Sequence, residues 1–263
     1  QFAKKYDKLF AYARSLTNYD ITFGNLEGPI SDKGRDVGSI YSFRMSPTLA
    51  PALKRAGFDV VNVANNHAGD WGQEAFTDTL SRLGEFGIQY TGGGYDHGDA
   101  AGVTVLERKG IRIGFLGFSD VGPEWLKAGM ESPGILLASD SDFDSIIKRS
   151  ARSVDVLVVS FHFGDEYQSL SNERQKALAR RAIEDGARVV VGHHPHVTQE
   201  LERYNGGIIA YSLGNFVFDQ YFSQETMQGL ALSVTVNKGG VSGVTRLPFI
   251  INAQFQPLVD EKK

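Results

Sequence analysis

Three histidines lie within four consecutive positions of one short segment, GHHPH at residues 192–196. They are His193, His194 and His196, and they make up half of the six histidines in the chain. The segment follows the β-branched run 189–191, so the imidazoles collect where a strand is expected to end. Packing three imidazoles into one turn brings no obvious gain in stability. The pattern therefore predicts a site that holds a metal ion or transfers a proton.

Polar side chains also follow four other apolar runs of the sequence directly. They are Asn25 and Glu27 after Ile21–Phe23, Asn65, Asn66 and His67 after Phe58–Ala64, His162 and Glu166 after Val154–Phe161, and Asn215 after Ile208–Ser212. In open α/β sheets, ligands bind at the carboxyl ends of the strands. We therefore expect these segments to meet the histidine turn at one edge of the fold.

Imidazole nitrogens, carboxylates and amide oxygens are suitable ligands for divalent cations such as zinc, manganese and iron. Because the chain contains no cysteine, thiolate metal sites and cysteine nucleophiles are excluded. A divalent ion polarises a phosphoryl or carbonyl oxygen and generates hydroxide from bound water. The residue types therefore favour hydrolysis of an ester or an amide.

Each of these residues also has a structural interpretation. A single histidine at a strand end, such as His162, is often a hydrogen-bonded structural residue, and asparagines such as Asn25, Asn66 and Asn215 often close turns or cap helices. Asp70, Glu166 and Asp219 either orient a metal ligand or face water. His97 has no companion in its glycine-rich loop, which is typical of a surface residue.

The periodicity of apolar residues predicts helices that alternate with short strands. Helices are expected at residues 4–16, 46–57, 76–86, 142–152 and 172–184, with Ser46 and Pro47 at the start of the second. Strands are expected at 21–23, 58–64, 88–90, 103–107, 111–118, 154–161, 188–191, 208–212, 229–236 and 241–250. This alternation predicts an α/β fold with a largely parallel sheet, a hairpin at 103–118, and an antiparallel hairpin at 229–250 at a sheet edge. We expect a flexible turn at 92–94 and an irregular insertion at 120–138.

Composition places the chain among globular proteins, with 41% hydrophobic and 22% charged residues. Its 263 residues are expected to form one domain, 1–263. The formal net charge is −4 and the basic residues are scattered, so no nucleic-acid partner is expected. The chain begins at Gln1, and we expect an N-terminal strand and any membrane anchor to lie outside it.

Five segments carry a resemblance to a known family: NLEGP (25–29), VANNHAGDWG (63–72), FHFGDEY (161–167), GHHPHVTQ (192–199) and YSLGNFVFDQ (211–220). In this order they closely resemble the CapA-like bacterial capsule synthesis proteins. That family is associated with poly-γ-glutamate capsule production and lies within the calcineurin-like metallophosphoesterase superfamily. The resemblance implies a four-layer α/β/β/α metallophosphoesterase-like fold.

The resemblance also implies roles for particular residues. The expected metal ligands are Glu27, Asn66, His162, His194 and His196, which would hold one or more divalent ions (Mn, Zn or Fe). The expected catalytic residues are His67 and His162. The expected substrate-binding residues are Asn25, Asn65, Glu166, His193 and Asn215. Whether His193 or His194 takes the first place of the paired histidines stays open.

The sequence departs from the superfamily pattern at two places, which leaves the number of metal ions open. Ala68 stands where many phosphoesterases carry an acidic residue. No segment before Asp20 matches the Asp-containing motif of the superfamily's first strand.

The leading hypothesis is a cell-surface protein of poly-γ-glutamate or capsule assembly with a metal-dependent hydrolytic site. It would act on an anionic polymer or a small molecule, beside membrane-bound capsule synthesis partners at the extracellular face of the membrane. One alternative is a non-catalytic polymer-binding or export scaffold on the same fold. Another is a general metal-dependent phosphoesterase.

Overall fold

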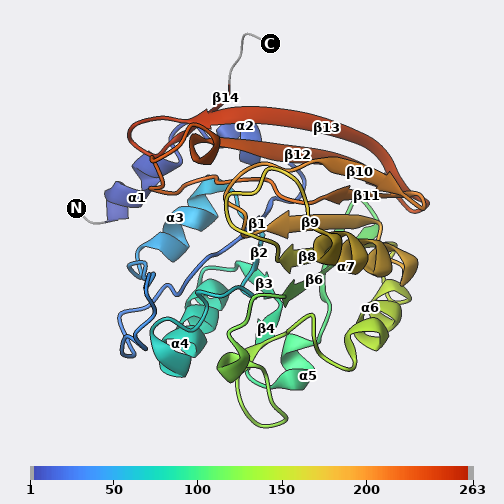
Figure 1. The fold of residues 1–263 in the computed structure, drawn as a ribbon, viewed down its shortest axis with the longest axis horizontal. Coiled ribbons are helices and arrows are strands. Elements are labelled where there is room, and N and C mark those ends of the chain that lie inside the picture. The colour runs from blue at the N-terminus through green and yellow to red at the C-terminus, as the bar shows by residue number, and fades with distance from the viewer. Residues whose placement is uncertain (1–2, 260–263) are drawn as a thin grey trace.

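A computed structural model describes residues 3–259 of the chain, in which short helices alternate with strands (Figure 1). The α-helices are α1 Ala3–Leu9, α2 Arg14–Thr17, α3 Leu49–Ala56, α4 Gly72–Glu85, α5 His97–Ala100, α6 Phe143–Ala151 and α7 Glu173–Glu184. The strands are β1 Phe23–Asn25, β2 Val60–Asn62, β3 Gln89–Thr91, β4 Gly93–Gly94, β5 Thr104–Arg108, β6 Ile111–Ser119, β7 Gly134–Ile135, β8 Val156–His162, β9 Val189–His193, β10 Leu201–Tyr204, β11 Gly207–Ala210, β12 Gln228–Asn237, β13 Gly240–Ile251 and β14 Pro257–Val259.

Two sheets form the centre of the molecule. The first is parallel, in the order β1-β2-β3, and the second has the order β10-β11-β9-β8-β6-β5. In the second sheet β6, β8, β9 and β11 are parallel, and only the edge strands β5 and β10 are antiparallel. The predicted hairpin at 103–118 is confirmed as β5 and β6. The predicted α/β fold with a largely parallel sheet is therefore confirmed.

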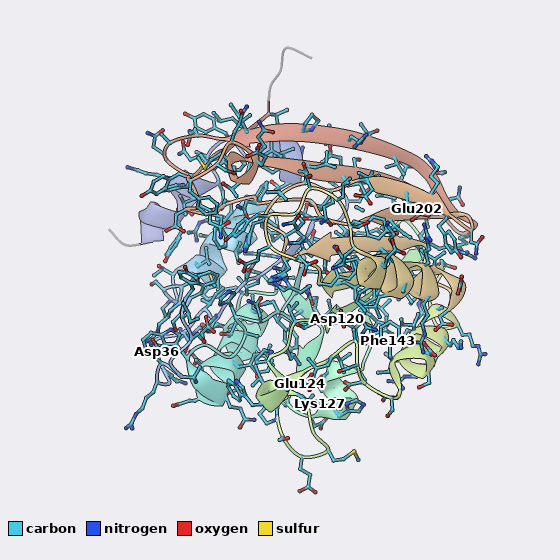
Figure 2. The ribbon with its side chains drawn as sticks, viewed as in Figure 1. Asp36, Asp120, Glu124, Lys127, Phe143 and Glu202 are labelled. Carbon is cyan, nitrogen blue, oxygen red and sulfur yellow. The ribbon has the colours of Figure 1, made fainter. Side chains whose placement is uncertain are left out.

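Helices cover the outer face of each sheet, and the inner faces pack against each other. The first outer layer is built by α3 and α4, with Leu53 and Phe76 in its core. The second is built by α6 and α7, whose Phe143 and Leu178 lie in a cluster with alternate residues of β8; Phe143 is labelled in Figure 2. Between the sheets, Val60 of β2 packs in the same cluster as residues of β6 and β8. This is the four-layer α/β/β/α arrangement that the family resemblance implies.

The predicted C-terminal hairpin is confirmed, but it forms a sheet of its own. Strands β12 and β13 pair over ten residues, and β14 adds a third strand (Figure 1). Val234 and Val244 of the hairpin pack against Val189 and Val191 of β9. The hairpin therefore extends the inner face of the sandwich beyond the first sheet and is not an added edge of the second.

The N-terminal helix, which was expected to be continuous, is interrupted. The chain turns tightly after α1, where Ala13 N–H donates to Phe10 O and Leu16 N–H donates to Ala13 O. These three side chains are buried and lie three residues apart, a spacing that suits tighter turns better than an α-helix. Tertiary packing therefore overrides the helical pattern.

Three smaller predictions are also corrected. The second helix begins at Leu49 after Thr48 and not at Ser46 and Pro47, although Gly57 ends it as expected, with φ 103°. The glycines at 93–94 form the buried strand β4 and not a flexible turn, because the missing side chains let Phe76 and Val63 approach Gly93 and let α5 approach Gly94. Strand β10 was not predicted, because its sequence LERY lacks an apolar run.

Candidate metal-binding site

Strands of both sheets end at one edge of the sandwich, and four of the predicted metal ligands meet there: Glu27, His162, His194 and His196. His162 ends β8 and is in register with His193, which ends β9. From the first sheet, Glu27 reaches the histidines: its Oε1 lies 3.8 Å from His162 Nε2 and 3.6 Å from His196 Nε2. The rings of His162 and His194 are 4.9 Å apart. Residues separated by more than 160 positions in the sequence thus share one site.

The side-chain alternation of β8 explains why His162 points toward Glu27. Val156 and Val158 pack between the two sheets, whereas Leu157 and Val159 pack against the helices behind the second sheet. His162 has the same parity as Val156, so it faces the first sheet. It is completely buried there.

Several buried polar atoms at this edge have no hydrogen-bond partner within the protein. They are Glu27 Oε1, Asn66 Oδ1, both ring nitrogens of His162, His193 Nε2 and His194 Nδ1. More than nine in ten buried polar groups of folded proteins are paired, so such a concentration calls for an explanation. All of these atoms are of the types that coordinate divalent cations. The donor set therefore fits a metal ion, although no three His, Asp or Glu side chains within residues 3–259 already form a complete metal-binding cluster.

Backbone strain is concentrated at the same place. His194 and His196 have φ angles of 101° and 59°, and Tyr167 has 62°, all in the left-handed region that favours glycine. The two loops that contain them are joined, because Tyr167 N–H donates to Pro195 O over 2.8 Å. Strain of this kind persists only where surrounding contacts enforce it, and it is common at functional sites.

The orientation of His196 is determined by Asn215. The amide nitrogen of Asn215 donates to Thr226 O and Gln220 Oε1, so its oxygen faces His196 Nδ1 at 2.9 Å. His196 Nδ1 therefore carries the proton, and the lone pair of Nε2 is directed to the side of Glu27. Asn215, predicted to bind substrate, thus supports a predicted metal ligand in the way that is common around metal sites.

His67 is held by Asp70, a residue that the sequence left ambiguous. His67 Nδ1 donates to Asp70 Oδ2 over 2.7 Å, and the same carboxylate accepts from Phe43 N–H and Ser39 Oγ. The ring of Phe43 stacks on His67 with 3.7 Å between centroids. Both contacts fix the imidazole and leave its Nε2 as the atom that can exchange a proton.

Asparagines hold the ends of β1 and β2 in place. Asn62 donates to Asn25 Oδ1, and Asn25 in turn donates to Glu27 Oε2 over 3.5 Å. Asn65 donates to Leu26 O and Val63 O and accepts from His67 N–H, so its amide is fully used within the protein. Asn25 and Asn65 therefore lie behind Glu27 and His67. Their role in substrate binding stays a prediction.

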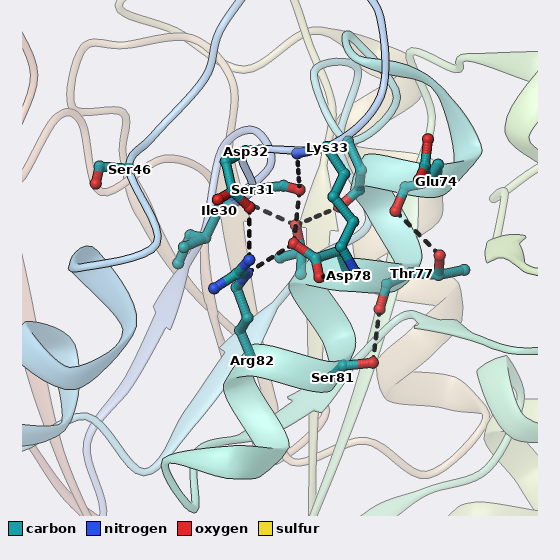
Figure 3. Close-up of polar contacts among 12 residues, drawn as sticks. Ile30, Ser31, Asp32, Lys33, Ser46, Glu74, Thr77, Asp78, Ser81 and Arg82 are labelled. Carbon is teal, nitrogen blue, oxygen red and sulfur yellow. Dashed lines mark hydrogen bonds and ion pairs between the residues drawn. The ribbon is translucent and has the colours of Figure 1, made fainter.

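The chain that follows Glu27 is fastened to α4 by Asp78 (Figure 3). The Asp78 carboxylate accepts from Ser31 Oγ and forms ion pairs with Lys33 and Arg82. Arg82 also bonds Asp32, which belongs to the same loop. This network fixes the loop between β1 and α3 from outside the site.

Burial dominates the electrostatics of the cluster. Burial, together with the nearby carboxylates of Glu166 and Asp70, raises the pKa of Glu27 to about 8. Burial also lowers the pKa of His193 and of His194 to about 4, and the pKa of His162 lies well below its usual value because of burial and its neighbouring imidazoles. Without a metal, Glu27 therefore holds a proton at neutral pH, and His162, His193 and His194 are neutral. Neutral imidazoles are the form that binds metal, and a bound cation would favour the ionised form of Glu27.

The outer edge of the site is formed by residues of both loops and of neighbouring strands. Glu166 is exposed and close enough to Glu27 and His196 to affect their pKa values. Asp120, labelled in Figure 2, follows β6 and pairs with Arg174 of α7 over 2.7 Å. Two surface grooves, of about 340 and 370 Å³, lie elsewhere along β3, α5 and β5, and none of the residues with unpaired buried atoms at the site lines them.

Sequence reasoning missed two kinds of residue at this edge. Asn62, which holds Asn25, was hidden inside an apolar run, and its polarity there was the only signal. Phe43 and Phe218 were not selected, because a single aromatic residue in a loop carries no chemical signature.

Comparisons with known proteins agree with the expected family and fold. The family model described as bacterial capsule synthesis protein PGA_cap matches residues 1–220. The PGA biosynthesis protein CapA of Bacillus subtilis is 34% identical over 250 residues, which cover 94% of this chain and 66% of that protein. The capsule biosynthesis protein CapA of Bacillus anthracis is 37% identical over 216 residues, 78% of this chain and 52% of that protein. The chain thus spans between half and two-thirds of the length of these relatives.

Solved structures with low sequence identity share the fold. A hypothetical protein from Thermus thermophilus superimposes with a TM-score of 0.59 at 17% identity, covering 94% of both chains. A 5′-nucleotidase precursor from the same organism superimposes with a TM-score of 0.50 at 16% identity, covering 80% of this chain and 42% of that one. The chain belongs to the CapA-like bacterial capsule synthesis family and has a calcineurin-like metallophosphoesterase fold.

Proposed function

We propose that the protein acts in the biosynthesis of a poly-γ-glutamate capsule and that its site is a metal-dependent hydrolytic centre. One observation carries the catalytic part: buried oxygen and nitrogen atoms without hydrogen-bond partners gather where the two sheets end, on Glu27, Asn66, His162 and His194. The names of the Bacillus relatives carry the biological part. The substrate would be an anionic polymer or a small molecule that contains an ester or an amide.

Glu27, Asn66, His162, His194 and His196 would hold one or more divalent ions, with Mn, Zn and Fe all compatible with the donors. When bound, such an ion supplies Lewis acidity and a hydroxide nucleophile. Glu27 Oε1 lies 3.6 Å from His196 Nε2 and 3.8 Å from His162 Nε2, so these three side chains are close enough to hold the same ion. Asn215 presents the free nitrogen of His196 to that position.

His67 would transfer the proton. Asp70 stabilises the imidazolium form, so His67 Nε2 can protonate the leaving oxygen or nitrogen. Phe43 prevents the ring from turning away. Glu166 and His193 are proposed to contact the substrate from the exposed and buried sides of the site.

Capsule assembly takes place in the cell envelope, so we propose a location at the extracellular face of the membrane, beside membrane-bound synthesis partners. Within residues 3–259, no helix has the length and apolar character needed to cross a bilayer.

Metal analysis of the full-length protein, followed by hydrolysis assays on a phosphodiester and a γ-glutamyl amide, tests the proposal. We expect a bound divalent ion, and turnover that is lost in His67→Ala while the ion is retained. Absence of a bound ion after incubation with Mn²⁺, Zn²⁺ and Fe²⁺ would contradict the catalytic proposal and favour a polymer-binding scaffold. Turnover of simple phosphodiesters without γ-glutamyl amides would favour a general phosphoesterase.

A further inference from the structure

Aromatic side chains form a continuous surface along one side of the site. Phe43 lies against His67, Phe218 is 5.5 Å from Phe43, and His196 is 4.8 Å from Phe218 (ring centroids). Tyr167 continues the row at 6.0 Å from His196. We call Phe43, Phe218 and Tyr167 the aromatic wall. It runs from the proposed proton donor to a proposed metal ligand and beyond.

The wall is built from three separate loops, and the site's own residues hold two of its members. Phe43 donates its N–H to Asp70, the partner of His67. Tyr167 accepts a hydrogen bond from Gln220, which is bonded to Asn215, the partner of His196. The wall is therefore coupled to the two imidazoles between which it lies.

Core packing does not account for the wall. Phe43 and Phe218 are only half-buried and Tyr167 is 43% exposed, although other aromatic residues of the chain are completely buried. Large apolar side chains left open beside a polar site offer surface to a ligand. Aromatic faces bind carbon-rich or planar groups, and they offer nothing to a second anionic group.

Negative charge near Tyr167 strengthens this selection. Burial is the main cause of the raised pKa of Tyr167, and the nearby carboxylate of Glu166 is the second. The same carboxylate also raises the pKa of Glu27. An anionic substituent placed along the wall would meet this carboxylate. A methylene chain or an amide plane would not be repelled.

The geometry points to the aromatic wall as a specificity surface that binds the uncharged, carbon-rich or planar part of the substrate beside the bond that is cleaved. This inference rests on the proposed function, because it requires an anionic or carbonyl group held at the metal-binding residues. It adds the class of group that must flank the reacting bond.

Equilibrium binding of two probes to the Mn²⁺-loaded full-length protein separates the wall from the rest of the site. Inorganic phosphate occupies only the metal-binding residues, whereas phenylphosphonate also carries a planar ring, on a P–C bond that the site cannot hydrolyse. We expect phenylphosphonate to bind about 3- to 10-fold more tightly than phosphate, the range of one aromatic contact. Phe218→Ala should reduce this ratio to about one while phosphate affinity changes less than about twofold. Phe218→Leu, which keeps apolar volume, should restore part of the ratio.

Tyr221→Ala is the matched control, because Tyr221 is 76% exposed and its ring faces Phe255, outside the wall. It should leave the ratio unchanged. Equal affinities of the wild type for both probes, or a ratio that survives in both Phe218→Ala and Phe43→Ala, would overturn the inference while leaving the proposed function intact. Loss of phosphate affinity together with Mn²⁺ in Phe218→Ala would also overturn it, because the wall would then only support the ligands. If the wild type binds neither probe with Mn²⁺ present, the proposed function itself fails.

Discussion

At the scale of single residues, the site separates groups that would touch a metal ion or substrate from groups that hold them. Asp70, Asn62 and Asn215 are held away from the centre, and each fixes one of its members by a hydrogen bond. Substitutions at the two kinds of residue should therefore have different effects.

Asp70→Asn should lower turnover without removing the metal. The variant keeps the shape of the side chain but loses the charge that stabilises protonated His67, so we expect kcat to fall about 100-fold. Kinetics on the compound that the wild type hydrolyses, with metal content measured on the same sample, check this.

Ser39→Ala is the control for Asp70, because it removes a hydrogen bond to the other carboxylate oxygen and leaves the His67 pair intact. It should retain most activity. If Asp70→Asn loses its metal, Asp70 is needed to form the metal site, and its proposed role in proton transfer by His67 is contradicted.

At the scale of elements, contacts outside the site determine where its loops lie. The Asp78 network fastens the chain after β1 to α4 (Figure 3). The close approach of β9 to the segment after β11 positions the histidine turn. Both contacts can be tested by stability without an activity assay.

The Asp78 network should make stability sensitive to acid. Burial opposes ionisation of Asp78, but hydrogen bonds from Lys33, Ser31 and Arg82 outweigh it and lower its pKa to about 2, from 3.8. A lowered folded-state pKa means that the stabilisation is complete above about pH 4 and is lost as pH falls toward 2. It amounts to about 2 kcal/mol.

Asp78→Asn should therefore lower the free energy of unfolding by about that amount at pH 7 and show a smaller loss between pH 4 and pH 2. Urea unfolding across this range measures both effects. Glu74→Gln is the control, because Glu74 is an exposed carboxylate of the same helix. Equal acid sensitivity of the wild type and Asp78→Asn would contradict the assignment.

Gly192 should not tolerate a side chain. A Cβ at this position would lie 1.9 Å from Tyr211 O and 2.5 Å from the ring of Phe163. Gly192→Ala should therefore displace β9 just before His193 and cost about 1–3 kcal/mol or more. Thermal unfolding of the purified variant measures this.

Gly84 of α4, unlike Gly192, should tolerate an added side chain. No atom lies within 4 Å of the position of its Cβ, and Gly84 belongs to α4. Gly84→Ala should raise stability by about 0.5–1 kcal/mol, because alanine favours helix more than glycine does. If Gly192→Ala unfolds at the same temperature as the wild type, β9 can shift without loss of stability and the prediction for Gly192 is wrong.

At the scale of the whole molecule, the proposed metal ligands come from both sheets. Glu27 and Asn66 follow strands of the first sheet, whereas His162 ends β8 and His194 directly follows β9 in the second. An ion bound by both groups would join the two halves of the sandwich.

Metal binding should therefore raise the melting temperature. At a free Mn²⁺ or Zn²⁺ concentration of 100 times the dissociation constant, linkage stabilises the protein by about 2.7 kcal/mol, or roughly 5–10 °C for a chain of this size. Scanning calorimetry with the metal and with a chelator measures the difference. His162→Ala should remove most of it, whereas His97→Ala, at a distant His97–Asp142 pair, should keep it. An equal shift in His162→Ala would contradict the proposed ligand set.

The sequence alone determined the fold class and the segments that carry the chemistry. Strand and helix periodicity indicated the α/β alternation, and polar residues after apolar runs indicated the strand ends that form the site. These patterns involve residues that are close in the sequence, so they can be recognised without the tertiary structure. The same reasoning erred at 93–94 and at β10, where packing and not local pattern decides the conformation.

Only the tertiary structure decided how the site residues divide their tasks. Spacing could not show that Asn215 faces His196 or that Asp70 supplies the carboxylate behind His67. Nor could it show that Phe43 and Phe218 line the site. Each of these contacts joins loops from different parts of the chain, and their distances depend on how two sheets pack. Burial likewise sets the pKa of Glu27, and burial is a property of the assembled sandwich.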